Sequence, residues 1–414
     1  MSAESRQRRF SLFSVYFTFA VDTLGTAIVF PIFGPLFLES GYGLIPPSLA
    51  PYRSVLLGCF LMIFPFLQLF LSPILGEYAD GRGRKRSLLW TSCLTTLGFA
   101  LSAWSIYERS VTWLFLSRIV MGIGSGNLSV CLSALADLSR DERHKPKYYG
   151  YGAAISGLVY VVGPFVGGKL ADPEVFSLAD PSLPMMLGAF LAFCNVFFIL
   201  FAFRETFRLH PDTHFDPMQG IRNIFLALKN PAMKDCYSIY FFYLFSWNVI
   251  LLFAPAVAVR KFALSENRVG EICALMALCW IFGTTLLRRF FHTLCKARYI
   301  ASGSFLFYGL SIFSALFFMH RETILLVLLG ICAVTAGLAW PFCVSRISDV
   351  APATMQGKVL GLSQSVSSVA TLLSALCGGI ALGSHVSLLL ALSGVSALVA
   401  LGFTECGPRK RYGW

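Results

Sequence analysis

Long apolar segments alternate with short polar ones along the whole chain. Each apolar segment has roughly 17 to 25 residues, the length that an α-helix needs to cross a bilayer. We count about twelve of them, so the pattern predicts an all-α integral membrane protein with about twelve transmembrane helices. The expected spans are Phe10–Leu38, Val55–Leu75, Leu88–Tyr107, Thr112–Leu138, Tyr148–Leu170, Pro184–Phe203, Cys236–Val259, Val269–Leu287, Ile300–Met319, Thr323–Ile347, Val359–Ile380 and Val386–Phe403.

The composition supports this class, and the placement of charge predicts an orientation. Of 414 residues, 56% are hydrophobic and 13% are charged, whereas soluble domains have about 25% charged residues. The net charge of +12 would indicate a nucleic-acid partner only if the bases were clustered on one folded domain. When the spans are threaded through a membrane, most Lys and Arg residues instead fall on the side of the amino terminus. This bias predicts that both termini are cytoplasmic.

A polar stretch from Glu205 to Lys234 divides the apolar segments into two sets of six. We therefore expect an amino-terminal bundle over residues 1–204, a cytoplasmic linker over 205–233 and a carboxy-terminal bundle over 234–414. Within the linker, Asp216 and Pro217 can start a short helix with one apolar face along the membrane surface, or the segment is a plain flexible linker.

The two sets also share markers. Asp137 precedes Gly167 and Gly168 at nearly the same spacing at which Asp349 precedes Gly378 and Gly379. Repeated halves are common in secondary transporters, whose substrate site forms between the halves near the middle of the membrane. The markers therefore favour two diverged copies of one unit.

A charged loop joins the second and third spans with the pattern Gly76-x-x-Ala79-Asp80-x-x-Gly83-Arg84-Lys85. Glycines permit a tight turn between helices that leave the membrane together, and Asp80 can cap a helix or pair with a base. The pattern resembles the signature loop of the major facilitator superfamily, in which the loop latches one conformation. Tyr78 and Gly81 depart from the family pattern. The family's base after the aspartate meets an acid at the end of the fourth span, here Asp137, and Arg82 or Arg84 could take its place.

Three further motifs carry the same resemblance. The fourth span contains Arg118 followed by Gly122, Gly124 and Gly126, similar to the family's arginine motif, which is linked to proton coupling. An arginine inside a span faces a cavity or partner, or reaches back to the membrane surface. The fifth span contains Gly157 and Gly163-Pro164-Phe165-Val166-Gly167-Gly168. This stretch resembles the antiporter motif of exporters, in which glycines and a proline form a contact surface on which the halves rock.

The first span contains Asp22 in the stretch from Val21 to Pro31, which is similar to the first-helix motif of drug:proton antiporters, including tetracycline efflux pumps. Asp22 lies about 18 Å into the helix, near the middle of the bilayer. A carboxylate at that depth could alternate between a proton and a cationic substrate, or it is a structural acid bonded to Thr23 or Thr26. Other polar groups within the spans are candidates for the cavity wall: Gln68, Asn127, Asn248 and Gln364.

No enzyme site emerges from the sequence. There is no nucleotide-binding GxxxxGK[ST] loop, so energy for transport would come from an ion gradient. The 12 cysteines and 6 histidines are dispersed without metal-ligand spacing, so we expect no metal and no cofactor.

Together, these features predict a secondary active transporter of the major facilitator superfamily. The resemblance implies proton-coupled efflux of small, partly hydrophobic compounds by alternating access, with Asp22 binding the proton and Arg118 tuning its affinity. We expect a monomer in a bacterial inner membrane. Two alternatives stay open: a proton-coupled importer of a metabolite or nutrient, and a membrane scaffold or sensor without transport.

Overall fold

The computed structural model describes residues 3–139, 145–175, 177–206, 218, 222, 225, 231–294, 296–350 and 356–406. Within these residues the chain forms helices and no strands, and twelve helical segments are long and apolar enough to cross a membrane. The predicted all-α membrane fold is thus confirmed. The linker predicted over 205–233, with its surface helix, lies almost wholly outside the described residues.

The helices group into two compact units. The first unit contains residues 1–47, 63–219 and 265–270, and the second contains 48–62, 220–264 and 271–414. Each unit therefore includes a short end of a helix whose remainder belongs to the other. The division into bundles over 1–204 and 234–414 stays a prediction.

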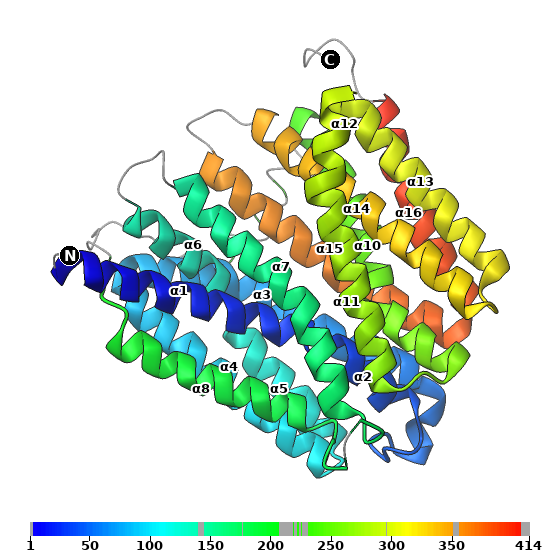
Figure 1. Ribbon diagram of the computed structural model, residues 1–414, viewed down its shortest axis with the longest axis horizontal. Helices are drawn as coiled ribbons and strands as arrows, with labels where there is room; N and C mark the ends of the chain where they lie inside the picture. Colours follow the sequence, from blue (N-terminus) through cyan, green and yellow to red (C-terminus); the bar gives the residue numbers. More distant parts are fainter. Residues whose placement is uncertain are drawn as a thin grey trace. The chain divides into compact units, whose positions relative to one another are not determined.

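The helices of the amino-terminal part are drawn from blue to green in Figure 1. In this part α1, α4 and α8 pack side by side, and α7 lies along α1 and α2. The helices are α1 (Ala3–Ala27), α2 (Phe30–Leu38), the 3₁₀ turn η1 (Pro47–Tyr52), α3 (Arg53–Arg82), α4 (Arg84–Tyr107), α5 (Val111–Ile123), α6 (Asn127–Leu138), α7 (Lys145–Ala171) and α8 (Leu183–Phe201).

The helices of the carboxy-terminal part follow in yellow-green to red in Figure 1. Here α10 packs against α14, α15 and α16, and α13 packs against α14 and α16. The helices are α10 (Pro231–Phe262), α11 (Glu266–Phe282), the π-helical turn η3 (Gly283–Leu287), α12 (Arg288–Leu294), α13 (Ala297–Phe318), α14 (Glu322–Val350), α15 (Gln356–Ser384) and α16 (Val386–Cys406).

Two spans that the sequence predicts as continuous helices are interrupted. The first span breaks at Ile28 and Val29, between α1 and α2. Pro31 follows the break directly, and its ring lacks the N–H that would bond the carbonyl of Ala27 and crowds that carbonyl. The fourth span breaks over residues 124–126, between α5 and α6, where two glycines and a serine favour helix weakly.

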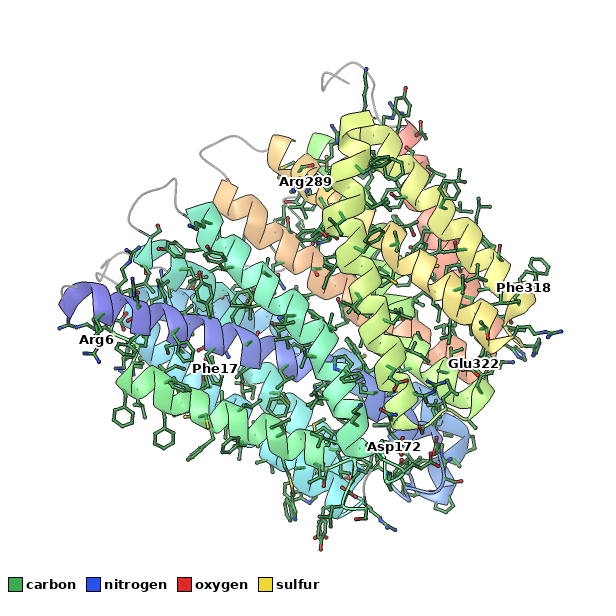
Figure 2. The ribbon with its side chains drawn as sticks, in the orientation of Figure 1. Arg6, Phe17, Asp172, Arg289, Phe318 and Glu322 are labelled. Atoms are coloured by element: carbon green, nitrogen blue, oxygen red, sulfur yellow. The ribbon has the colours of Figure 1, made fainter. Side chains whose placement is uncertain are left out.

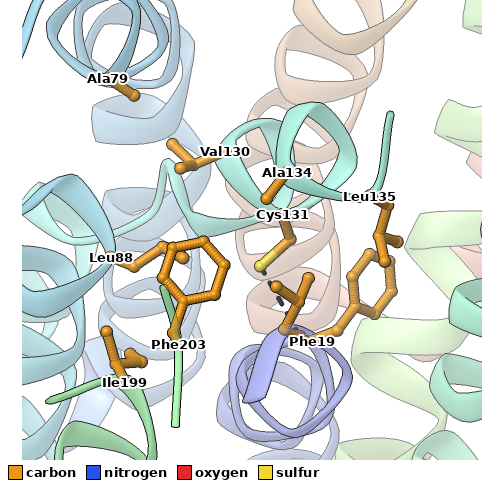
Figure 3. Close-up of a cluster of buried hydrophobic side chains, with 10 residues drawn as sticks. Phe19, Ala79, Leu88, Val130, Cys131, Ala134, Leu135, Ile199 and Phe203 are labelled. Atoms are coloured by element: carbon orange, nitrogen blue, oxygen red, sulfur yellow. Dashed lines mark hydrogen bonds between the residues drawn. The ribbon is translucent and has the colours of Figure 1, made fainter. Parts of the chain in front are cut away.

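A cluster of buried side chains fixes one end of the first unit (Figure 3). Val15 and Phe19 of α1 pack against Cys131 and Leu135 of α6, and the Cys131 thiol lies 3.9 Å from the carbonyl oxygen of Val15. Leu88, Ile199 and Phe203 close the cluster from α4 and the end of α8. Since lipid is as apolar as these side chains, the cluster holds the helices by close packing rather than by exclusion of water.

Hydroxyl groups join three helices of the second unit. Ser246 of α10, Tyr308 of α13 and Ser393 of α16 are all buried. The Tyr308 hydroxyl donates to the carbonyl of Ser246 at 3.0 Å, and the Ser393 hydroxyl donates to the same carbonyl at 2.9 Å. Each such interhelical bond contributes about 1 kcal/mol in a membrane. The three helices are therefore joined by polar contacts inside an apolar bundle.

The start of α3 and the carboxy-terminal third of α15 meet backbone to backbone within the second unit. A Cβ atom on Gly379 would lie 2.7 Å from the Cα of Gly58 and 2.9 Å from the carbonyl oxygen of Ser54. A Cβ on Gly58 would lie 2.7 Å from the carbonyl oxygen of Ala375. Only glycine allows two helices to approach so closely. The Gly378-Gly379 marker found in the sequence is thus a helix crossing point.

Replacing Gly379 with alanine should lower the stability of the protein. The added methyl group meets main-chain atoms that cannot move aside, so we expect a loss of about 1 to 3 kcal/mol, measured as a lower melting temperature in detergent. Gly303→Ala in α13 is the matched control, because nothing lies within 4 Å of its added Cβ. That variant should be neutral or slightly stabilising, and an equal effect of the two substitutions would contradict the crossing point.

Candidate functional site

Asp22 lies in the last two turns of α1 and is partly buried. The side chain of Asn127, at the start of α6, lies close enough to the Asp22 carboxyl group to interact with it. The Thr91 hydroxyl of α4 bonds the Asn127 amide oxygen. Asn127 is 2% exposed, and with its oxygen bonded to Thr91 its NH₂ group is the part that can donate to a neighbouring acceptor. Three spans thereby contribute to one polar group.

The hydroxyls nearest to Asp22 in the sequence bond elsewhere. Thr23 donates to the carbonyl of Phe19 at 2.8 Å, and Thr26 donates to the carbonyl of Thr23 at 2.8 Å. Among the described residues, neither threonine hydroxyl forms a hydrogen bond with the Asp22 carboxylate. Tyr160 of α7 lies 3.3 Å from the Thr26 hydroxyl and close enough to Asp22 to interact with its charge.

Arg118 lies in a separate polar group on α5. Its side chain is 4% exposed, and its guanidinium carbon lies 4.8 Å from the centre of the Phe33 ring of α2. A cation over an aromatic face is stabilised by about 2 kcal/mol when it is removed from water. The neighbour of Arg118 in the structure is thus Phe33, whereas the neighbour of Asp22 is Asn127.

The two polar groups lie at different depths of the same helix pair. Phe33 is eleven residues beyond Asp22 on the first span, and Asn127 is nine residues beyond Arg118 on the fourth. At 1.5 Å per helical residue the two groups are about 15 Å apart. Both helix breaks lie between them. An effect of Arg118 on Asp22 must therefore act through the breaks and not by direct contact.

The antiporter-like glycines of α7 pack against the break in the first span. A Cβ on Gly163 would lie 3.1 Å from the Cβ of Ala27, and one on Gly167 would lie 3.4 Å from the carbonyl oxygen of Ile28. Glycine at both positions lets α7 lie against the unwound backbone. Pro164 is inside α7, and Gly157 is partly buried about two turns earlier.

The last glycine of this motif has a different neighbour. A Cβ on Gly168 would lie 2.5 Å from the carbonyl oxygen of Glu266, and one on Gly270 would lie 2.4 Å from the carbonyl oxygen of Pro164. These residues all belong to the first unit. The start of α11 thus meets α7 backbone to backbone, as α15 meets α3 at Gly379.

The charged loop between α3 and α4 is held by two acids from distant parts of the chain. Arg84 is buried, and its Nε lies 3.4 Å from the Asp137 carboxylate at the end of α6. The sequence leaves Arg82 and Arg84 as candidates for this pairing, and the structure selects Arg84. Gly83 between the helices has φ of 100°, a conformation that other residues rarely adopt.

Glu205, just after α8, caps the amino terminus of α4. Its carboxylate accepts the backbone N–H of Arg84 at 2.9 Å and that of Lys85 at 3.0 Å. A carboxylate is favoured there by the helix dipole as well as by the unpaired N–H groups. The Lys85 ammonium donates to the carbonyl of Leu200 at 2.8 Å. Gly76 lies within α3, and the side chain of Asp80 is outside the described part of the chain.

The remaining cavity candidates are not gathered around Asp22. Asn248 of α10 donates to the Thr371 hydroxyl of α15 at 2.9 Å. Gln364 lies on α15 and Gln68 on α3, both partly buried. Of the four amides predicted from the sequence, the structure joins Asn127 to the carboxylate.

Sequence reasoning missed a polar group at the opposite end of α2. Tyr42 donates to the carboxylate of Glu266, and the Asp172 carboxylate accepts the backbone N–H of Asn267 at 3.2 Å. Burial raises the pKa of the Tyr42 hydroxyl, and its bond to Glu266 raises that pKa further. These residues hold the start of α11 to the ends of α2 and α7. Tyr42, Asp172 and Glu266 are far apart in the sequence, so no motif spacing could have predicted that they meet.

A family model and the curated relatives fit this arrangement. The model described as Major Facilitator Superfamily matches residues 15–293, which include both polar groups and the charged loop. The chain belongs to the major facilitator superfamily. It is therefore a multi-pass membrane transporter of a small molecule, as the family resemblance predicts.

Individual members of the superfamily resemble it at modest identity. The class D tetracycline resistance protein of Salmonella ordonez is 24% identical over 360 residues, 84% of each chain. The class H protein of Pasteurella multocida is 28% identical over 172 residues, and the match spans 40% of each chain. The crystal structure of a D-xylose-proton symporter superposes with a TM-score of 0.77 at 16% identity, covering 95% of this chain and 96% of that one. This last likeness shows the superfamily fold alone.

Removing the Glu205 carboxylate should destabilise the loop between the second and third spans. Glu205→Ala leaves the first N–H groups of α4 without their acceptor, at a cost of about 1 kcal/mol. Thermal unfolding in detergent measures it, and Glu205→Gln should lose less because its amide oxygen still accepts. Glu174→Ala, in the loop before α8, is the control. Equal melting temperatures for Glu205→Ala and the parent would contradict the cap.

A large side chain at Gly167 should disturb the first span of this transporter. In Gly167→Leu the new side chain must displace Ile28 or move α7, so we expect substrate flux to fall at least tenfold while the protein still inserts. Gly150→Leu on the same helix has nothing within 4 Å of the added Cβ and should keep its flux. Normal flux in Gly167→Leu would show that contact with the break is unimportant.

Proposed function

We propose that this transporter exports a small, partly hydrophobic compound in exchange for protons, by alternating access and as a monomer with both termini in the cytoplasm. The observation that carries the proposal is the Asp22 carboxyl group inside a span, next to the Asn127 amide. A carboxylate at the bilayer centre costs about 3 kcal/mol on insertion scales. A group retained at that cost is best explained by function.

The neighbours of Asp22 support a role in which its carboxylate binds a proton and the substrate in alternation. Asn127 is a neutral neighbour, which interacts with the carboxylate without supplying a compensating positive charge. Arg118 stacks on Phe33 at the other depth, so no salt bridge to it ties down the acid. Asp22 therefore keeps one charge to be neutralised, either by a proton or by a cationic group of the substrate.

The direction of transport rests on α7 and on the relatives. The antiporter-like glycines contact the break beside Asp22, so a movement of α7 is transmitted to the helix that carries the acid. The relatives named for tetracycline resistance favour export of a foreign compound over uptake of a nutrient. Arg118 would act on the same break from its opposite side, as a positioning residue.

Asp22→Asn should abolish proton-coupled transport and leave the protein inserted. The experiment uses inside-out vesicles with an acidified lumen and a fluorescent pH probe, to which lipophilic cations, tetracyclines and ordinary metabolites are added. We expect proton release on addition of a compound with the parent and none with Asp22→Asn. Asn127→Ala should slow release about tenfold, the cost of one hydrogen bond to a charged group.

Glu39→Gln is the control, because this carboxylate lies beyond the end of α2. It should release protons like the parent. Antiport that persists in Asp22→Asn would remove Asp22 from the mechanism. Accumulation of a metabolite with protons, and no release with any exported compound, would establish the importer instead.

A further inference from the structure

A hollow lined by aromatic rings lies on the first unit between α1 and α8. It has a volume of about 430 Å³, within the range of roughly 300 to 1,000 Å³ that is typical of small-molecule sites. Its walls are apolar except for one glutamine. The lining residues are Gln7, Phe10, Phe197, Phe198, Phe201 and Ala202.

The hollow is open towards the surroundings of the protein. Phe10 is 47% exposed and Phe201 is 80% exposed, so these rings face lipid when the spans lie in a bilayer. The lining rings also contact other rings of the same two helices: the Phe13 and Phe198 rings meet edge to face at 5.2 Å, and Phe193 and Phe197 do so at 4.9 Å. The concave shape is thus a packed feature of the helix pair.

One end of the hollow is polar and basic. Gln7 closes it by donating to the carbonyl of Ala202 at 3.3 Å. The Arg6 guanidinium lies 5.8 Å from the centre of the Phe10 ring, and the Lys85 ammonium bonds the carbonyl of Leu200, one residue before Phe201. Figure 2 shows Arg6 at the free end of α1. Arg204 is exposed two residues beyond Ala202.

An acid also lies close to this end, and its oxygens are directed at the backbone. Glu205 directs its two carboxylate oxygens at the backbone N–H groups of Arg84, Lys85 and Thr206. The bases Arg6 and Lys85 thus contact residues at or beside the polar end of the hollow, and Arg204 follows two residues after its lining residue Ala202.

This combination matches one chemical class. An acyl chain gains little by moving from the surrounding lipid to an apolar groove, since the two are equally apolar. Selectivity must then come from the headgroup, and basic side chains at the membrane surface attract anionic lipids. We propose that the hollow binds an anionic phospholipid of the leaflet next to the basic side of the protein. Its acyl chain lies against Phe10, Phe197 and Phe201, and its phosphate lies beside Arg6, Lys85 and Arg204.

Photo-crosslinking of the full chain in nanodiscs tests this site. The discs contain phosphatidylcholine with a small fraction of a phospholipid that carries a diazirine in its acyl chain, either phosphatidylglycerol or phosphatidylcholine. After irradiation, adducts are mapped by mass spectrometry. We expect at least fivefold more phosphatidylglycerol than phosphatidylcholine adducts on α1 and the end of α8. The exposed rings of Phe307 and Phe317 on α13 should label equally with both probes.

Two sets of variants separate a headgroup site from ordinary lipid contact. Arg6→Gln/Lys85→Gln/Arg204→Gln should remove the phosphatidylglycerol excess at the hollow. Arg288→Gln/Arg289→Gln/Lys296→Gln, a matched loss of exposed bases elsewhere, should keep it. Ala202→Leu, which fills the hollow, should reduce adducts of both probes there, and gel filtration checks that each variant is monodisperse.

Equal labelling by the two probes at the hollow of the parent protein would overturn the proposal and show ordinary boundary lipid. A phosphatidylglycerol excess that survives the loss of Arg6, Lys85 and Arg204 would overturn it as well, because the headgroup would then be held elsewhere. Both results are measured as crosslinked lipid and not as transport. The lipid site is therefore tested independently of the proposed proton exchange.

Discussion

A carboxylate in the apolar part of a bilayer must be compensated by the protein, because no water shell is available there. In this transporter the polar side chain that interacts with Asp22 is the amide of Asn127, which is itself bonded by Thr91. The arrangement needs α4 and α6 to be close to α1 at a single depth. The buried cluster around Val15, Phe19 and Cys131 (Figure 3) supplies that closeness less than three turns away.

The two helix breaks separate the polar group at Asp22 from the one at Arg118. Two long continuous helices would hold both polar groups in one rigid frame, whereas breaks after Ala27 and before Asn127 let the segments on either side adopt separate directions. Unwound backbone in a membrane must be covered by protein. Gly163 and Gly167 bring α7 against Ile28 and provide this cover. A motif associated with antiporters thus has a structural role beside the acid.

The sequence predicted the spans and their number, because apolar length alone determines whether a helix can cross the membrane. It also supplied Asp137 as a partner for the charged loop. It could not choose between Arg82 and Arg84, since that choice depends on which one points inward after the turn at Gly83. Nor did it find Thr91: hydroxyls recur every four residues on α4 at Ser87, Thr91 and Thr95, and nothing in that spacing distinguishes the one that meets Asn127. The cap by Glu205 depends on a fold contact over 120 residues of chain.

The neighbour chosen for Asp22 also restricts how a proton can reach it. An amide can donate a hydrogen bond but does not release its proton, so Asn127 cannot pass a proton to Asp22. In the proposed exchange the proton would have to reach the carboxyl group from another side, and the Asp22 side chain is partly exposed. Whatever lies at that exposed part, water or cargo, would then control the rate of protonation.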